Sequence, residues 1–245
     1  MPNTSTGMAR GWKALLTETP ILGPVTRQLA RSRPVAALRR QLAFRGSSAY
    51  WEERYRNGGT SGAGSYGRLA AFKAEVLNDF VARAGIRSVV EFGCGDGAQL
   101  ALARYKRYVG LDVSATSVAL CRARFAGDPG KTFHLASELP LHYGTFDLGL
   151  SLDVIYHLVE DPVFDAYMRQ LFQRSTRYVV IYASDTAHPT DTPHVRHRNF
   201  TGWIGEHAPD WTLAERIENR YPYDPAQPEE TSFADFYIYR RKDSP

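Results

Sequence analysis

A carboxylate and a histidine four residues apart, Asp153 and His157, form the pair in this sequence best suited to moving a proton. One turn of helix would place both side chains on the same face. The ordinary pKa of histidine, about 6.5, suits the removal of a proton from a hydroxyl near neutral pH. The sequence therefore predicts His157 as a general base and Asp153 as its catalytic partner. A purely structural role for His157 is the competing interpretation.

Three of the seven histidines of the chain, His188, His194 and His197, lie within ten residues and close to Arg196. Histidine and carboxylate side chains together can bind a divalent ion, which would lower the pKa of a bound hydroxyl. Three interpretations are open: a metal site, a basic patch in which His194 and Arg196 bind the substrate, or a solvated loop.

The third chemical feature is the glycine-rich segment Glu-Phe-Gly-Cys-Gly-Asp-Gly at residues 91–97, which follows three β-favouring residues. Only glycine combines positive φ with the absence of a side chain, so this turn must approach another group closely. A following helix would point its amides at that group. Asp112 lies 21 residues after Glu91, at the expected end of the next strand, where its carboxylate could accept both hydroxyls of a ribose.

Alternating strands and helices must position these residues. The pattern predicts an α/β fold with a doubly wound, seven-stranded, mostly parallel sheet and a C-terminal antiparallel hairpin. In such a sheet, ligands bind at the carboxyl ends of the strands, beside the point where the strand order reverses. The predicted strands are 88–92, 108–112, 132–135, 146–152, 178–182, 211–218 and 233–239, and the predicted helices are 69–84, 98–105, 115–125, 163–174 and 200–207.

Composition favours one medium-sized α/β domain with an appendage, because 43 % of the 245 residues are hydrophobic and 23 % are charged. Two cysteines without CxxC spacing are too few for a disulfide framework. No apolar run approaches the roughly 20 residues of a membrane span, and no signal peptide is evident. We therefore expect a cytoplasmic protein.

Charge is unevenly distributed along the chain. Residues 1–45 contain eight basic residues and one acidic residue, which leaves 22 basic and 25 acidic residues after position 45. A nucleic-acid enzyme more often has its basic surface on the domain that holds the active site, so this distribution argues against nucleic acid as substrate. Residues 1–45 are interpreted as a basic extension, which either packs on the body or on a second subunit of a homodimer, or binds an anionic membrane surface peripherally.

Residues 46–85 are predicted to form a helical cap and a glycine-rich lid, ahead of a core at 86–245. Tyr50 and Trp51 lie on one face of the expected cap helix. The loop after it has five glycines and several hydroxyl residues, including Ser65. Such a composition is typical of a loop that closes over a ligand.

The segment 91–97 resembles the first motif of class I S-adenosylmethionine-dependent methyltransferases, and the resemblance extends over about residues 50–240. It implies a Rossmann-like methyltransferase fold and S-adenosylmethionine as the cofactor. It further implies that Asp112 holds the ribose and that Val113 packs on the adenine. The other residues that it assigns to the cofactor are Tyr50, Ser65, Glu91, Gly93, Cys94, Gly95 and Ser137.

The turn from Asp153 to His157, with a histidine after the fifth strand, resembles the metal site of small-RNA 2′-O-methyltransferases and of some quinone-precursor O-methyltransferases. This resemblance implies a site for Mg²⁺ or another divalent metal formed by Asp153, His157 and His197. Tyr156 stands where those families have glutamate.

For the acceptor, the sequence favours a sugar hydroxyl of a polysaccharide, glycolipid or glycosylated metabolite. Aromatic side chains stack on sugar faces, and polar side chains bind hydroxyls. The chain also resembles actinobacterial polysaccharide methyltransferases of the methylmannose type. The alternatives are a small aromatic or amine metabolite, RNA 2′-O-methylation, and a non-catalytic cofactor-binding scaffold. The predicted substrate residues are Tyr66, Tyr156, His194 and Arg196.

Overall fold

The computed structural model describes residues 44–138, 144–190 and 192–243. The chain divides into two units, Met1–Arg45 and Gly46–Pro245. The interpretations of the basic extension, including its contacts with a membrane or a second subunit, fall almost wholly outside the described residues and stay predictions.

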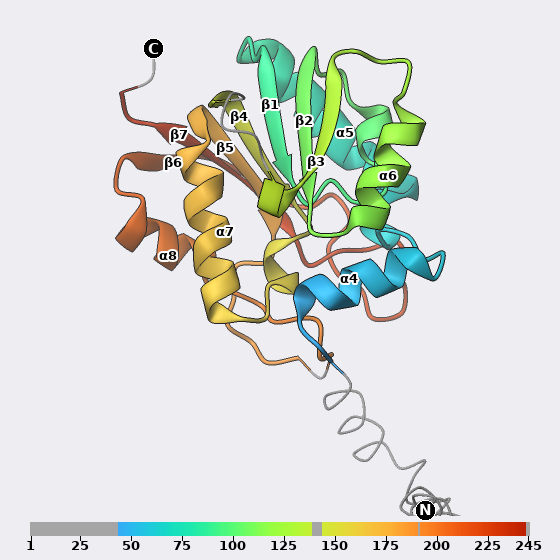
Figure 1. Cartoon of the computed structure of the whole chain (residues 1–245). Coiled ribbons are helices and arrows are strands. Elements are labelled where there is room, and N and C mark those ends of the chain that lie inside the picture. Colours follow the sequence, from blue (N-terminus) through green and yellow to red (C-terminus); the bar gives the residue numbers. More distant parts are fainter. Residues whose placement is uncertain (1–43, 139–143, 191, 244–245) are drawn as a thin grey trace, which may run out of the picture. The chain divides into compact units, whose positions relative to one another are not determined.

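The second unit is built on a seven-stranded sheet with the strand order β3-β2-β1-β4-β5-β7-β6 (Figure 1). β1 to β5 run parallel, and β7 pairs antiparallel with both β5 and β6. The predicted fold class is confirmed. The strands are β1 Ser88–Phe92, β2 Arg107–Asp112, β3 Lys131–Leu135, β4 Phe146–Leu152, β5 Ser175–Ala183, β6 Trp211–Ile217 and β7 Asp235–Arg241.

The strand order reverses between β1 and β4. The chain runs outward from β1 through β2 to β3 and then returns to place β4 on the other side of β1, where Val90 pairs with Gly149. Loops leaving β1 and β4 therefore diverge at their carboxyl ends, which is the usual position of a ligand site in such sheets.

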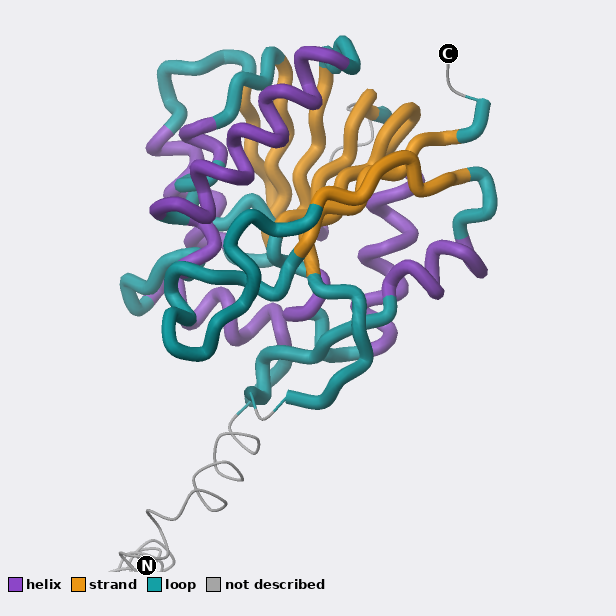
Figure 2. Tube along the Cα trace, turned by 180° about the vertical axis from the view of Figure 1, so that it is seen from behind, coloured by secondary structure: helices purple, strands orange, loops and turns teal. Residues whose placement is uncertain are grey.

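Helices cover both faces of the sheet, as the opposite views in Figures 1 and 2 show. One core contains Leu77 and Phe80 of α5, and the other contains Met168 and Leu171 of α7. Both pairs are spaced by three residues, so each helix turns one apolar stripe toward the strands. The helices are α4 Ser47–Arg56, α5 Gly67–Arg83, α6 Ala115–Arg124, α7 Asp161–Gln173 and α8 Phe200–His207.

The helix predicted for residues 98–105 is wrong. The segment forms only a 3-10 turn, Leu100–Leu102, and Ala103 is already extended. The Asn78 side chain of α5 explains the early end: its amide donates to the carbonyl of Leu102, and its oxygen accepts from the amide of Arg104. These two bonds satisfy backbone groups that a continuing helix would have used.

Helix α4 crosses the carboxyl ends of the strands (Figure 1) and is fastened on two sides. Glu52 accepts hydrogen bonds from the hydroxyls of Ser114 (2.6 Å) and Thr116 (2.8 Å) at the start of α6. The amide of Ser47 donates to Glu160, the residue before α7, over 2.9 Å. The helix therefore bridges the two halves of the sheet above the reversal point.

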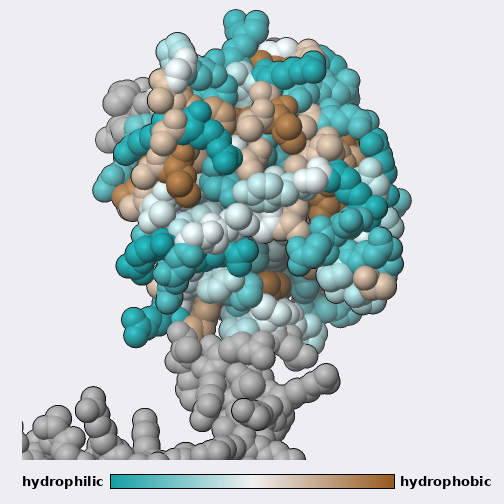
Figure 3. All heavy atoms as spheres, turned by 90° about the vertical axis from the view of Figure 1, so that its right-hand side faces the viewer, coloured by the Kyte–Doolittle hydropathy of each residue, from teal (hydrophilic) through white to brown (hydrophobic). Residues whose placement is uncertain are grey.

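The surface seen in Figure 3 has hydrophilic side chains surrounding scattered hydrophobic ones. Within the described part of the chain, no helix has the length and apolar character needed to cross a membrane.

Candidate active site

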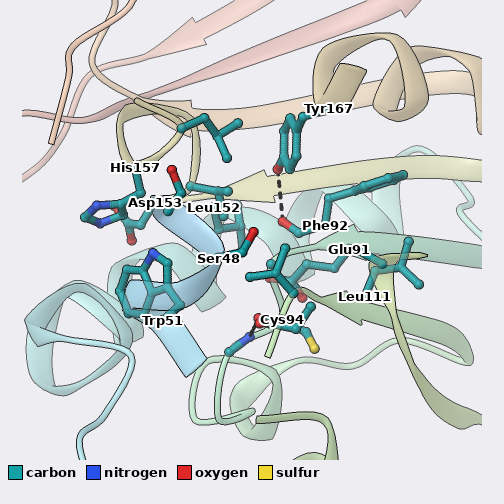
Figure 4. Close-up of a pocket in the computed structure, with 18 of the residues that line it drawn as sticks. Ser48, Trp51, Glu91, Phe92, Cys94, Leu111, Leu152, Asp153, His157 and Tyr167 are labelled. Carbon is teal, nitrogen blue, oxygen red and sulfur yellow. Dashed lines mark hydrogen bonds between the residues drawn. The ribbon is translucent and has the colours of Figure 1, made fainter. Parts of the chain in front are cut away.

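A cavity of about 450 Å³ lies at the carboxyl ends of β1, β2 and β4, bounded by α4 and α7. Figure 4 shows Trp51, Asp153 and His157 at one end and Cys94 and Leu111 at the other. The cavity is lined by ten of the residues predicted for catalysis or cofactor binding, which are Ser65, Glu91, Gly93, Cys94, Gly95, Asp112, Val113, Ser137, Asp153 and His157.

The glycine-rich turn is closely surrounded. Gly93 has φ 86°, and a Cβ there would lie 2.4 Å from Val154 Cγ2. Gly95 has φ 56°, and a Cβ there would lie 2.3 Å from Ser61 Oγ. The carbonyl of Leu111 on β2 accepts from the amides of Gly93 (2.7 Å) and Cys94 (3.0 Å). Both conformation and space therefore require glycine at these positions, and the turn is held against β2.

Asp112 is buried beside this turn. One carboxylate oxygen accepts from the Gly95 amide and the other from the Ser114 amide, each over 2.9 Å. Burial raises the pKa of Asp112, and these backbone donors oppose that shift. Hydrogen bonding by the Ser117 side chain and the Val113 backbone also lowers the pKa of Asp112, and the residue lines the cavity.

The glycine-rich loop between α4 and α5 is fastened to the same turn through Asp96. The Asp96 carboxylate accepts from the Ser61 amide (2.9 Å) and from the Tyr66 hydroxyl (2.7 Å), while the Asp96 amide donates to Ser61 Oγ (2.9 Å). Since Ser61 and Ser65 also line the cavity, this loop forms one of its walls.

Glu91 lies below the turn with 4 % of its surface exposed. Burial raises the pKa of Glu91 to about 7, against the hydrogen bond from the Tyr108 hydroxyl (2.6 Å) and the nearby positive charge of Lys73. The negative charge of Asp112 adds to the increase. Below about pH 7 the folded protein therefore favours the protonated form of Glu91.

This shift predicts a pH-dependent stability that the substitution Glu91→Gln should remove. As the pH rises from about 4.5 to about 7, unfolded Glu91 has lost its proton while the folded state still retains it, so stability falls over this window. Between pH 5 and pH 8 the loss is roughly 2 kcal/mol. Urea unfolding at both pH values measures the free energy of unfolding of each protein. Between pH 5 and pH 8, the stability of Glu91→Gln relative to the parent should rise by that amount. A constant difference at both pH values would contradict the assignment.

Asp153 follows β4 in an unusual conformation. Its φ of 60° is the single positive value among the described non-glycine residues, and such strain costs about 1–3 kcal/mol. The carboxylate accepts from Lys73 Nζ (2.5 Å) and from the Tyr156 hydroxyl (2.8 Å), and the Asp153 amide donates to the Tyr182 carbonyl (2.9 Å). Contacts from α5, β5 and the following turn therefore hold this strained residue in place.

His157 is nearly surrounded by other rings, with Trp51 edge-on at 4.9 Å between ring centroids. Its Nδ1 lies 2.9 Å from the carbonyl oxygen of His194. Because a carbonyl can only accept, Nδ1 carries the proton and the lone pair is on Nε2. Burial lowers the pKa of His157 to about 4, so the ring is neutral at physiological pH.

The comparisons with known proteins agree with this geometry. Residues 89–176 match the family model described as "Methyltransferase domain". Residues 89–176 therefore carry the methyltransferase domain that this family model describes. No curated protein matches the sequence significantly.

Solved structures resemble this methyltransferase in fold. The N-methyltransferase NodS from Bradyrhizobium japonicum, in complex with S-adenosyl-L-homocysteine, is 17 % identical, with a TM-score of 0.62 over 81 % of this chain and 100 % of that one. The magnesium protoporphyrin IX methyltransferase from Synechocystis PCC 6803 is 15 % identical (TM-score 0.54; 89 % and 99 % covered). The methyltransferase domain of bacterial CtHen1 is 13 % identical (TM-score 0.54; 69 % and 96 % covered). At these identities the likeness concerns the fold alone.

Several residues predicted for the site of the methyltransferase do not line its cavity. Tyr50, predicted to bind the cofactor, instead stacks on His194 at 4.3 Å between ring centroids. Tyr66 is bonded to Asp96, and Arg196 pairs with Asp161 over 2.9 Å. Two of the four predicted substrate residues contact residues of the cavity: the Tyr156 hydroxyl binds Asp153, and the His194 carbonyl lies 2.9 Å from His157 Nδ1. The predicted binding roles of these residues have no support from their positions.

The metal site predicted from Asp153, His157 and His197 is not assembled. Among the described residues, no three histidine, cysteine, aspartate or glutamate side chains are placed to share an ion. The Asp153 carboxylate is paired with the Lys73 ammonium, which repels a second cation, and His197 Nδ1 lies 2.6 Å from Ser184 Oγ. These residues do not fit a divalent metal.

The sequence interpretation missed Lys73, Gln99 and Tyr167, which all line the cavity of the methyltransferase. Tyr167 donates to the carbonyl of Phe92 over 3.0 Å and so closes the side formed by α7 (Figure 4). The position of Lys73 could have been noticed in the sequence, because it follows Leu69 by four residues in the apolar stripe of α5. A lysine inside such a stripe is a candidate for a buried charge.

Proposed function

We propose that this methyltransferase transfers a methyl group from S-adenosylmethionine to a hydroxyl group, with a sugar as the acceptor class. One observation carries the proposal: a neutral histidine, His157, lines the same cavity as the glycine turn and Asp112. The cavity thus joins a nucleoside-binding end to a group able to take a proton from a hydroxyl.

The residues present fit this cofactor. The Asp112 carboxylate lines the cavity, where it can accept from ribose hydroxyls, and glycine at 93 and 95 lets the turn pack closely against Val154 and Ser61. The Oε1 atom of Gln99 is buried without a hydrogen-bond partner among the described residues, although Gln99 lines the cavity. An ammonium group is a suitable donor to that oxygen. When bound, S-adenosylmethionine supplies an electrophilic methyl group.

The protein's contribution to the reaction lies in orientation and proton removal. His157 Nε2 accepts the proton of the acceptor hydroxyl, while the bond from Nδ1 to the His194 carbonyl fixes the ring and its tautomer. Trp51 lines the cavity beside His157 and offers an aromatic surface for a sugar ring. Holding the hydroxyl in line with the methyl group removes much of the entropic barrier.

A second candidate is a small aromatic or amine metabolite as acceptor. The apolar side chains of Leu158, Pro162 and Val163, which also line the cavity, favour this alternative. RNA methylation is less well supported, since the metal-ligand arrangement proposed from sequence does not form and the described domain has no excess of basic residues.

The test is a transfer assay with methyl-labelled S-adenosylmethionine and a panel of oligosaccharides, phenols, amines and short RNAs, with and without EDTA. We expect labelling of a glycan hydroxyl at a rate that EDTA does not change. Labelling of phenols or RNA with no transfer to any glycan would overturn the sugar assignment. A loss of activity in EDTA, restored by Mg²⁺, would overturn the metal-independent reaction.

A further inference from the structure

The Lys73–Asp153 pair lines the cavity at the end where His157 lies. Both residues line the cavity, and Lys73 is 1 % exposed while the Asp153 side chain is 16 % exposed. Asp153 is therefore the member of the pair that an acceptor can reach, and Lys73 acts on it from behind.

Two acidic side chains lie near the Lys73 ammonium, Asp153 in direct contact and the buried Glu91, whose pKa the Lys73 charge lowers. The ammonium lies 2.5 Å from Asp153 Oδ2 and 5.2 Å from the centre of the Tyr182 ring. The neighbouring members of the same stripe, Leu69 and Leu77, are apolar core residues. Buried ion pairs are generally no more stabilising than well-packed apolar side chains, so stability alone does not explain the lysine.

The charges of Lys73 and Asp153 indicate which kind of acceptor the cavity favours. The Lys73 ammonium neutralises the Asp153 charge, but the carboxylate still has acceptor positions beyond those used by Lys73 and Tyr156. Such a carboxylate can accept a hydrogen bond from a neutral hydroxyl. Without Lys73 it would be a buried, uncompensated anion that attracts ammonium groups.

We propose that Lys73 is a positioning residue that makes the methyltransferase select a neutral hydroxylated acceptor over an amine, by neutralising and fixing Asp153. The inference rests on the proposed transfer to a hydroxyl and narrows its acceptor class. Gly64 supports the role of Asp153 as a fixed wall, because a Cβ at Gly64 would lie 2.7 Å from Asp153 Oδ2. The glycine-rich loop thus closes directly against this carboxylate.

The experiment compares Lys73→Met, Asp153→Asn and the double variant with the parent protein. The probes are methyl glycosides, their amino-sugar counterparts and a matched benzyl alcohol and benzylamine, and the readout is kcat/KM for release of S-adenosylhomocysteine. We expect the parent to prefer the neutral hydroxyl member of each pair at least about tenfold. Lys73→Met should reverse this preference, and the double variant, which is neutral again, should restore it.

Two controls separate a selective role from a structural one. Calorimetric binding of S-adenosylhomocysteine should be unchanged in each variant, which shows that the fold is intact. Lys131→Met removes a lysine whose partner is Asp128, outside the cavity, and should leave the preference unchanged.

The outcomes also separate this inference from the broader proposal. If Lys73→Met lowers kcat/KM for both members of a pair equally, or if the parent prefers the amines, the inference is overturned. If the preference reverses with the benzyl alcohol and benzylamine pair but no glycoside reacts, the sugar assignment is wrong and the selective role of Lys73 stands. An absence of turnover with every hydroxyl probe would overturn both.

Discussion

Replacing Asp112 with alanine is expected to weaken binding of S-adenosylhomocysteine by at least about a hundredfold. Two hydrogen bonds from ribose hydroxyls to an ionised carboxylate contribute about 3 kcal/mol together, which corresponds to that factor. The substitution also removes the acceptor that holds the Gly95 amide over 2.9 Å, so the glycine turn loses one of its supports. Isothermal titration calorimetry on both proteins measures the effect directly.

Asp128→Ala serves as the matched control for this substitution. Asp128 is an acidic residue outside the cavity, where it caps a turn and pairs with Lys131, so its removal should leave cofactor affinity unchanged. Asp112→Asn keeps the shape of the side chain and tests the charge, with an intermediate loss expected. If Asp112→Ala binds S-adenosylhomocysteine within about threefold of the parent affinity, Asp112 is not part of the nucleoside-binding site.

Replacing His157 with glutamine is expected to lower kcat by about 10²- to 10⁴-fold, the usual contribution of a general base. Affinity for S-adenosylhomocysteine should not change, because His157 lies at the opposite end of the cavity from Cys94 and Leu111 (Figure 4). The pair of measurements therefore separates a catalytic effect from damage to the cofactor site. His207→Gln, which alters a histidine stacked on Trp203 and outside the cavity, should leave both values unchanged.

The pH profile gives an independent test of the same assignment. A general base must be unprotonated, and burial lowers the pKa of His157 to about 4. The activity of folded enzyme should therefore persist as the pH falls through 6.5 and decline only near pH 4. A decline centred at 6.5 would show that another, exposed group controls the reaction. Unchanged kcat in His157→Gln would leave His157 with a structural role, the alternative that the sequence left open.

The sheet and its ligand edge could be predicted from the sequence because both depend on local signals. The bounds of β1 and β4 agree with the predicted strands, since short apolar runs end there at a glycine-rich turn or at a polar residue. Asp112 was found by its distance from the turn, and its position in the cavity follows from the parallel pairing of β1 and β2.

The remaining parts of the site depend on contacts between distant segments. The helix expected at 98–105 does not form, because Asn78 on another helix binds the backbone of Leu102 and Arg104. On α4, Trp51 lines the cavity, whereas the adjacent Tyr50 packs on His194. Helical periodicity alone does not predict which of two adjacent residues faces the cavity. The charge state of His157 likewise depends on burial, which spacing does not reveal.

The reciprocal bonds between Ser61 and Asp96 couple two segments that are 35 residues apart in the chain. With the bond from the Tyr66 hydroxyl, three hydrogen bonds join the loop wall to the glycine turn. A movement of this loop away from the cavity would have to break all three, and it would release Asp96, whose other carboxylate oxygen accepts from the Ala98 amide directly after the turn. The loop and the turn therefore behave as one mechanical unit.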